Sequence, residues 1–270
     1  MIPAEVRYRR ATSLEDALAA LAEEDARALA GGQSLLPVMK LRVARPSLVV
    51  DIGRLDLAGL ELEDGTLRIG ALTTWDALAR APELSTPALA AIPECASAIG
   101  DLQVRNRGTI GGSLAHADPA SDMPAVLLAL GAEVELRTAA EERSLPVAEL
   151  FVGPFTTALA QDELITEIRI PLPGSGSGSA YVAVEHPASG FALAGAAALV
   201  RPDGSSTVSL TGVSATPLLL GEKGDGSEAV GSVEVFGDRF APAEYRRALA
   251  ATVVRRALET ARARSEEERR

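Results

Sequence analysis

Two short segments of the sequence combine adjacent glycines with hydroxyl side chains, a composition that suits anion binding. The first reads Ala30-Gly31-Gly32-Gln33-Ser34-Leu35, and the second reads Thr109-Ile110-Gly111-Gly112-Ser113. Glycine places no side chain between backbone and ligand and reaches torsions closed to other residues. Consecutive amide groups can therefore converge on an anion. Two such loops suit a ligand with two phosphates, and we call them the first and the second glycine loop.

Each glycine loop also has a simpler interpretation as a surface turn, because a short glycine motif is weak evidence by itself. Neither loop contains the G-x-G-x-x-G dinucleotide fingerprint or the G-K-[ST] ending of a P-loop. The occurrence of two similar loops favours a shared ligand. Their spacing alone does not identify that ligand.

Other residue types that could do chemistry are sparse. His116 and Asp118 are close in sequence, but we interpret them as groups that organise a loop, and Trp75 as a helix residue that packs locally. The sequence shows no Ser-His-Asp order, no metal-ligand spacing and no carboxylate pair that stands out. The single cysteine, Cys95, excludes an intramolecular disulfide and an all-cysteine iron–sulfur or zinc site within one chain.

Composition restricts the class of protein. The chain has 270 residues, of which 47% are hydrophobic and 3% aromatic, so its core is built mainly from Ala, Leu, Val and Ile. A net charge of −11 argues against a nucleic-acid partner, which would need a basic face. No signal peptide or uninterrupted apolar run of about 20 residues is visible. We expect a cytoplasmic protein without a membrane span.

Residues 1–54 are expected to form a small α/β unit that positions the first glycine loop. Ser13 can cap a helix whose apolar stripe begins at Leu14. A strand over 27–30, a helix over 35–41 and a strand over 48–52 follow. The loop then lies at the carboxyl end of a strand, where open α/β sheets bind ligands.

Residues 55–173 are expected to form a second unit around the second glycine loop. Alternating polarity around Asp64-Gly65 predicts a hairpin over 60–70. Helices are expected from 73 through 81, over 89–99 and from Met123 to Leu130, with strands over 133–137 and 164–170.

Residues 174–270 are expected to form a small C-terminal domain. The Gly-Ser run over 174–179 predicts a flexible connector or a long hairpin loop. Two strands over 179–200, a third over 208–213 and a helix over 242–263 are expected to follow. The arginines of that helix are interpreted as a solvated face and the last residues as frayed; these arginines are Arg246, Arg247, Arg255 and Arg256.

Four segments resemble the flavoprotein, or medium, subunit of molybdenum hydroxylases of the carbon monoxide dehydrogenase and xanthine dehydrogenase type. They read AGGQSLLPVMKLRVARPSLVVDI from Ala30, VRNRGTIGGSLAHADPASDMPAVLLALGAEVEL from Val104, ELITEIRIP from Glu163 and EYRRALAATVVRRALETA from Glu244. The resemblance covers almost the whole chain. It implies an α+β fold with an FAD-binding domain of two α/β subdomains (PCMH-type) and a C-terminal domain of antiparallel strands and helices.

The resemblance also implies a cofactor, a site and partners. FAD would be held non-covalently, with its diphosphate across both loops, and would carry the redox chemistry. A large subunit with a molybdenum cofactor and a small subunit with [2Fe-2S] clusters would deliver electrons that leave to an external acceptor. The implied FAD-binding residues are Ala30, Gly31, Gly32, Gln33, Ser34, Leu35, Thr109, Ile110, Gly111, Gly112, Ser113, Asp122 and Ile165.

Two alternatives stay open at this point. One is a self-sufficient FAD-dependent oxidoreductase, and the other is a scaffold subunit that has lost its flavin. The second is suggested by residues 181–191, YVAVEHPASGF, where the family has a basic strand near the isoalloxazine. The family's lysine and arginines are absent here, and Gly190 stands where an aspartate is common.

Overall fold

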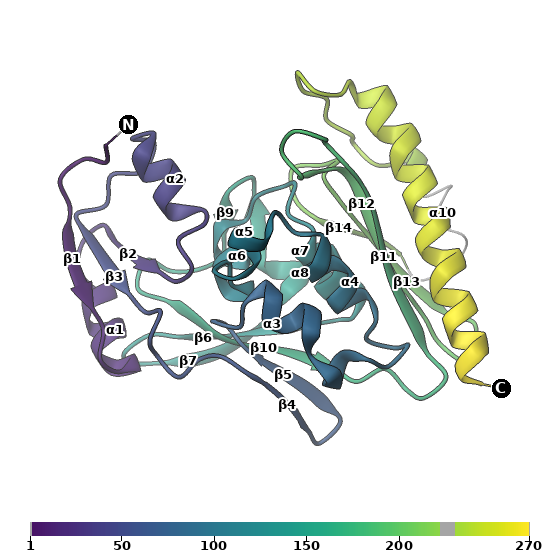
Figure 1. Cartoon of the computed structure of the whole chain (residues 1–270), viewed down its shortest axis with the longest axis horizontal. Coiled ribbons are helices and arrows are strands. Elements are labelled where there is room, and N and C mark those ends of the chain that lie inside the picture. The colour runs from purple at the N-terminus through teal and green to yellow at the C-terminus, as the bar shows by residue number, and fades with distance from the viewer. Residues whose placement is uncertain (1, 222–229, 270) are drawn as a thin grey trace.

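The computed structural model describes residues 2–221 and 230–269. The chain runs through three main sheets from one end of the molecule to the other (Figure 1). A three-stranded sheet lies at the N-terminal end, a five-stranded sheet in the middle, and a four-stranded sheet under a long helix at the C-terminal end. No helix in this described part of the chain is long and apolar enough to cross a membrane.

The N-terminal sheet is parallel, with strand order β1-β3-β2. Helix α1 begins after Ser13, whose hydroxyl accepts a hydrogen bond from the Asp16 amide, as the sequence predicted. Its buried face of alanines and leucines packs on β3. The elements are β1 (Arg7–Arg10), α1 (Leu14–Leu21), β2 (Ala26–Leu29), α2 (Leu35–Lys40) and β3 (Leu48–Asp51).

The middle sheet is antiparallel, with strand order β4-β5-β10-β6-β7. The hairpin predicted around Asp64-Gly65 joins β4 to β5, and both turn residues have positive φ. The strands are β4 (Leu60–Glu63), β5 (Thr66–Gly70), β6 (Glu133–Arg137), β7 (Glu142–Pro146) and β10 (Leu164–Pro171).

One face of the middle sheet shares a core with short helices, among them α4 and α7. A small two-stranded sheet, β8-β9, follows α8. These elements are α3 (Trp75–Arg80), η1 (Pro82–Leu84), α4 (Ala91–Ala98), α5 (Leu102–Arg105), α6 (Ile110–His116), α7 (Met123–Ala129), α8 (Val147–Leu150), β8 (Phe151–Gly153) and β9 (Thr156–Thr157).

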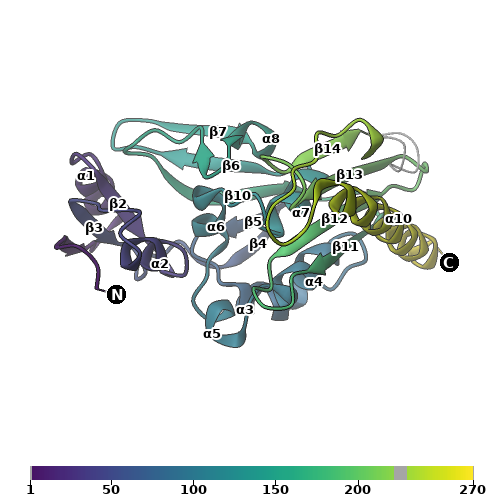
Figure 2. The same ribbon diagram turned by 90° about the horizontal axis from the view of Figure 1, so that it is seen from above.

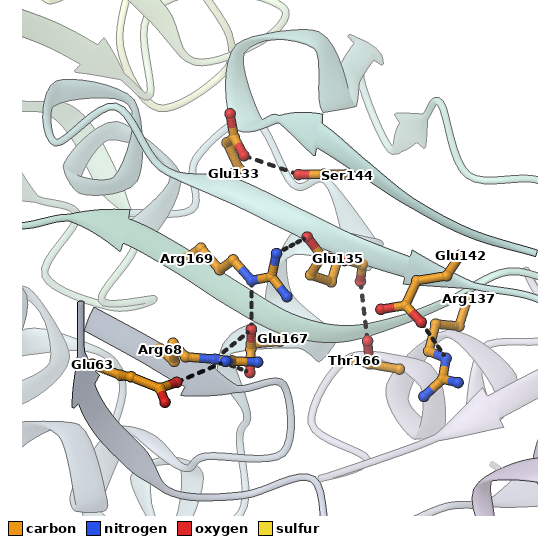
Figure 3. A network of polar contacts seen from close by, with 10 residues as sticks. All are labelled: Glu63, Arg68, Glu133, Glu135, Arg137, Glu142, Ser144, Thr166, Glu167 and Arg169. Carbon is orange, nitrogen blue, oxygen red and sulfur yellow. Dashed lines mark hydrogen bonds and ion pairs between the residues drawn. The ribbon is translucent and has the colours of Figure 1, made fainter. Parts of the chain in front are cut away.

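Charged side chains pair diagonally on the other face of the middle sheet (Figure 3). Strand register places Glu167 opposite Glu135 and Arg169 opposite Arg68, two pairs of like charges that would repel each other. The ion pairs instead run from Arg68 to Glu167 at 3.0 Å and from Arg169 to Glu135 at 2.7 Å. The network therefore favours the observed register of the three central strands.

The C-terminal sheet is antiparallel, with strand order β11-β12-β13-β14, and is covered on both faces. Helix α10 packs on β11 and β12 from outside, and α7 packs on β12 and β13 from the middle unit (Figures 1 and 2). The elements are β11 (Gly178–Glu185), β12 (Ala192–Val200), β13 (Ser206–Thr211), β14 (Leu218–Gly221) and α10 (Ala243–Glu268).

Two expectations for this region are wrong. The Gly-Ser run is not a free connector, because Ser177 is fully buried and a Cβ at Gly178 would lie 2.2 Å from the Ala261 carbonyl oxygen. Residues 265–268 are not frayed either, because α10 continues to Glu268 and Ser265 donates a hydrogen bond to the Gly176 carbonyl. Small residues here allow strand β11 to start directly against the last turns of α10.

The expected solvated arginine face of α10 is also partly wrong. Arg246 is buried and donates hydrogen bonds to the carbonyls of Leu193 and Gly212 and to the Asp238 carboxylate. Arg247 bonds backbone carbonyls as well, whereas Arg255 and Arg256 are exposed. The first turns of the helix are therefore fastened to the sheet by guanidinium groups.

Replacing Arg246 with methionine should destabilise the C-terminal unit. The variant keeps most of the apolar stem but leaves two carbonyls and a carboxylate without their donor, a loss of about 3 kcal/mol in the free energy of unfolding. Urea unfolding of the full chain measures this change. Arg255→Met, on the exposed part of the same helix, is the control, and equal stability of the two variants would contradict the fastening role.

Candidate functional site

The two glycine loops lie against each other. A Cβ at Gly31 would fall 1.7 Å from the Arg107 carbonyl oxygen, so the backbones touch where no side chain fits. A Cβ at Gly112 would lie 3.8 Å from the Cβ of Ala30, which places it on the side facing the first loop. The convergence that the sequence suggested is therefore present, and it joins the N-terminal sheet to the middle unit.

The first loop offers free backbone donors. It follows β2 and leads into α2, and Gly32 takes the left-handed conformation with φ +76°. No acceptor within the described chain takes a hydrogen bond from the amides of residues 31–35. The Ser34 hydroxyl makes no capping bond to α2. Unpaired amides in a partly buried loop satisfy their hydrogen bonds with solvent or a ligand, and several together suit an anion.

The second loop is built differently, because its amides already have acceptors. The amides of Ile110 and Gly111 bond the carbonyls of Thr73 and Ala71, and that of Gly112 bonds the Thr109 hydroxyl. A Cβ at Gly111 would lie 2.6 Å from the Cβ of Ala71, so glycine is needed there for close packing. This loop contributes shape and hydroxyl groups, and the backbone donors come from the first loop.

Trp75 supports the second loop, a role that extends its expected local packing. Its side chain is 3% exposed, and a Cβ at Gly108 would lie 2.7 Å from the indole Nε1. The Trp75 amide also donates to the Gly108 carbonyl. The indole therefore holds Gly108, the residue that precedes the second loop, in place. In the sequence, the position of Trp75 at the start of a capped helix was the only indication of a structural role.

Asp122 is buried immediately before α7, with 7% of its surface exposed. The phenol of Tyr181, on β11, donates a hydrogen bond to Asp122 Oδ1. Burial raises the pKa of Asp122 to about 6, and the Tyr181 hydrogen bond acts in the opposite direction. Burial also raises the pKa of Tyr181 well above its usual range. No local pattern of residues indicates this partnership, because the two residues are 59 positions apart.

The remaining expected residues lie near the loops or in the core. The Ser113 hydroxyl pairs with that of Ser121 at 2.9 Å. Ile165 is 4% exposed in the core of the middle unit, beside a bulge in β10. A contact between Ile165 and a cofactor stays a prediction, since core packing already accounts for its burial.

His116 and Asp118 organise their loop. The His116 ring packs on Phe155 with centroids 5.3 Å apart, and burial lowers its pKa. The Asp118 carboxylate accepts a hydrogen bond from the Ala120 amide. In residues 2–221 and 230–269, no group of three or more His, Cys, Asp or Glu side chains could hold a metal ion. Cys95 is buried, and burial raises the pKa of its thiol.

The divergent segment forms β11 and the hairpin that leads to β12. Tyr181 and Ala183 face the core shared with the middle unit, whereas Val182 and Val184 face α10. Gly190 has φ +71°, which suits glycine in the turn. The His186 ring lies over Phe240 at 4.5 Å between centroids. The inward row of β11 carries no cation.

Comparisons with known proteins agree with this architecture. The family described as "FAD binding domain in molybdopterin dehydrogenase" matches residues 4–173, and the chain belongs to it. The carbon monoxide dehydrogenase medium chain of Afipia carboxidovorans is 38% identical, over 98% of this chain and 99% of that protein. The glyceraldehyde dehydrogenase medium chain of Sulfolobus acidocaldarius is 42% identical, over 76% and 73% of the two chains.

Solved structures show the same fold. A carbon monoxide dehydrogenase chain from Hydrogenophaga pseudoflava superposes with a TM-score of 0.92 at 36% identity, over 98% of this chain and 99% of the other. A chain of quinoline 2-oxidoreductase from Pseudomonas putida superposes with a TM-score of 0.90 at 27% identity, over 98% of this chain and 99% of the other. The protein is an FAD-binding medium subunit of the molybdenum-dependent dehydrogenases, which are oxidoreductases.

Asp122→Asn should stabilise the flavin-free chain at neutral and higher pH. A pKa raised to about 6 means that the folded chain binds this proton more tightly than the unfolded chain. Stability therefore falls as pH rises from about 4 to about 6, and the loss persists above that range. The amide keeps an acceptor for Tyr181 without the charge, and should add about 2–3 kcal/mol near pH 8 and nothing near pH 4. Urea unfolding across this pH range is the measurement, and parallel pH profiles would show that Asp122 is not the titrating group.

Proposed function

We propose that the FAD diphosphate binds at the contact between the two glycine loops. The free amides of residues 31–35 supply backbone donors, and the hydroxyls of Ser34, Thr109 and Ser113 flank them. The observation that supports this most directly is the backbone contact of Gly31 with Arg107, which brings both loops to one place. Because Gly31 carries no side chain, the backbones of the two loops meet at the place where we propose that a phosphate binds.

The remaining expected contacts complete the proposed site. Asp122 Oδ1 is held by Tyr181, and Oδ2 accepts no hydrogen bond from another residue of the described chain. That oxygen suits a hydroxyl donor of the cofactor. We assign Ala30, Gln33, Leu35 and Gly112 to the wall of the site between the loops, and Ile110, Gly111 and Ile165 to the packing behind it.

We further propose three units, residues 1–54, 55–173 and 174–270, of which the first two enclose FAD. Their three separate sheets support this division. When bound, FAD supplies redox chemistry between reduced partner subunits and an external acceptor. The partners are a large molybdenum-cofactor subunit and a small [2Fe-2S] subunit. Relatives named medium chains support this assembly.

Gly112→Val should abolish flavin retention. The Cβ of the new side chain would crowd the Thr109 hydroxyl at 2.8 Å, and its methyl groups would enter the space towards Ala30, whose Cβ lies 3.8 Å from that Cβ. The FAD content of the purified chain, read from its visible absorption, measures the effect. Gly174→Val adds the same side chain where nothing lies within 4 Å and should retain FAD. A full complement of FAD in Gly112→Val would place the diphosphate elsewhere.

Ala183→Lys should raise the midpoint potential of the flavin if β11 approaches the isoalloxazine. A cation there stabilises an anionic reduced cofactor by Coulomb attraction, worth ~1 kcal/mol when screened. For a two-electron couple this corresponds to about 20 mV. Redox titration compares the variant with Ala140→Lys, in the exposed turn between β6 and β7. Equal midpoints would show that β11 does not reach the flavin or is screened by water.

The FAD-loaded chain alone should not oxidise an organic substrate, since no described group of side chains could bind a catalytic metal ion. Flavin bleaching after addition of a purine or an aldehyde measures this. Co-purification should recover a molybdenum and iron–sulfur protein that restores rapid reduction. Rapid bleaching of the lone chain would instead indicate a self-sufficient oxidoreductase.

A further inference from the structure

Residues 119–125, which comprise most of the connection from α6 to α7 and the first turn of α7, are held by hydrogen bonds from the C-terminal sheet. We call these residues the segment. Asp122 lies in its middle, and its carbonyl and carboxylate oxygens accept hydrogen bonds from β11, from β13 and from the residue after β13. The donors and acceptors are Thr211 Oγ1 with the carbonyls of Pro119 (3.1 Å) and Ser121 (2.6 Å), Ser209 Oγ with Ala125 O (2.5 Å), the Gly212 amide with Pro119 O (3.0 Å), and Tyr181 Oη with Asp122 Oδ1.

Every donor in this set belongs to the C-terminal unit and every acceptor to the segment. Ser209 and Thr211 are at most 1% exposed, and Tyr181 is 8% exposed. Buried hydroxyls without partners are costly, so these groups hold the segment in one position. The hydrogen bonds thus fix both the backbone around Asp122 and one oxygen of its carboxylate.

Strand β12 has a glycine, Gly195, at the position that the Tyr181 side chain passes on its way to Asp122. Gly195 pairs with Ala183 on one side and Thr211 on the other. A Cβ at Gly195 would lie 2.4 Å from Tyr181 Oη and 2.9 Å from Thr211 Cγ2. The phenol therefore crosses the central strand only because this position carries no side chain. Gly195 and Tyr181 of the C-terminal unit thus pack against each other, and Tyr181 bonds Asp122 of the middle unit.

The other end of the segment touches the second glycine loop. The Ser121 hydroxyl pairs with that of Ser113 at 2.9 Å. The Ser121 carbonyl therefore accepts a hydrogen bond from the Thr211 hydroxyl, and the Ser121 side chain contacts the loop. Two hydrogen bonds, joined through Ser121, therefore connect β13 with Ser113, the loop residue that follows Gly112.

We propose that the C-terminal sheet is a positioning element of the FAD site, acting through Tyr181 and Thr211 on Asp122 and Ser113. The inference rests on the proposed contact between Asp122 and FAD. It extends the determinants of cofactor affinity beyond residues 4–173, the part that the FAD-binding family covers. None of the positioning residues needs to touch FAD.

The test is the dissociation constant of FAD for the flavin-free full chain, measured by quenching of flavin fluorescence. Thr211→Val removes the hydroxyl that holds the segment, and Gly195→Ala keeps every donor but displaces the phenol. Each should raise the dissociation constant about tenfold, or about 1.4 kcal/mol. Thr207→Val is the matched control, because this buried β13 hydroxyl accepts a hydrogen bond from Arg201 and makes none to the segment. It should bind FAD as the parent does.

Tyr181→Phe supplies a readout that a purely structural role would not move. The phenol favours the ionised carboxylate, so its loss should raise the pH below which FAD affinity falls. Glu185 on β11, Asp118 in the same loop and Cys95 on α4 also face Asp122 and are unchanged in this variant. Thr211→Val should weaken binding without moving that pH. A uniform weakening by Tyr181→Phe at every pH would contradict its action on the carboxylate.

Asp122→Asn separates failure of this inference from failure of the proposed site. If Asp122→Asn binds FAD as tightly as the parent, the contact between Asp122 and FAD is wrong. If it weakens binding while Thr211→Val, Gly195→Ala and Tyr181→Phe match Thr207→Val, the site stands and the positioning role is wrong. Weakening by all four, with Thr207→Val unaffected, supports the inference.

Discussion

The backbone contact between Gly31 and Arg107 is the constraint on which the site depends. It sets how closely the N-terminal sheet approaches the middle unit, and any side chain at residue 31 would overlap a carbonyl oxygen. Behind it, Gly108 rests on Trp75 and Gly111 on Ala71. The glycines of the two loops therefore serve different purposes. Gly31, Gly108 and Gly111 allow close packing, whereas Gly32 takes the left-handed conformation in the loop whose amides have no described acceptor.

A buried carboxylate beside this contact opposes folding and is retained nevertheless. Asparagine at position 122 would keep an acceptor for Tyr181 without the charge. Asp122 is instead ionised at neutral pH, with one oxygen held by Tyr181 and the other without a hydrogen bond from another described residue. Strongly shifted groups of this kind concentrate at functional sites, where stability is exchanged for recognition. The position of Asp122 next to Ser121, which bonds Ser113 of the second glycine loop, also favours a functional role for Asp122 and does not depend on its charge.

Features encoded by neighbouring residues were predictable from the sequence, and features that depend on distant partners were not. The Ser13 cap, the Asp64-Gly65 hairpin and the two glycine loops are local signals, and family resemblance connected the loops to FAD. The Gly-Ser run reads as a flexible connector because its ordering comes from α10, more than 80 residues later. Arg246 reads as a solvated residue because its acceptors, Leu193 and Gly212, lie on other elements. Tyr181 was visible only as part of a divergent segment, because its contacts with Asp122 and Gly195 depend on residues distant in the sequence.

The hydrogen bonds between β13 and the segment before α7 have a consequence for synthesis of the chain. Thr211 lies 90 residues beyond Ser121, which accepts its hydrogen bond. While the ribosome is still translating the C-terminal third, both glycine loops have emerged but the segment around Asp122 lacks its donors. Vectorial synthesis thus leaves the segment around Asp122 without these hydrogen-bond donors until the last sheet pairs, so this segment takes its final position late in the folding of the subunit.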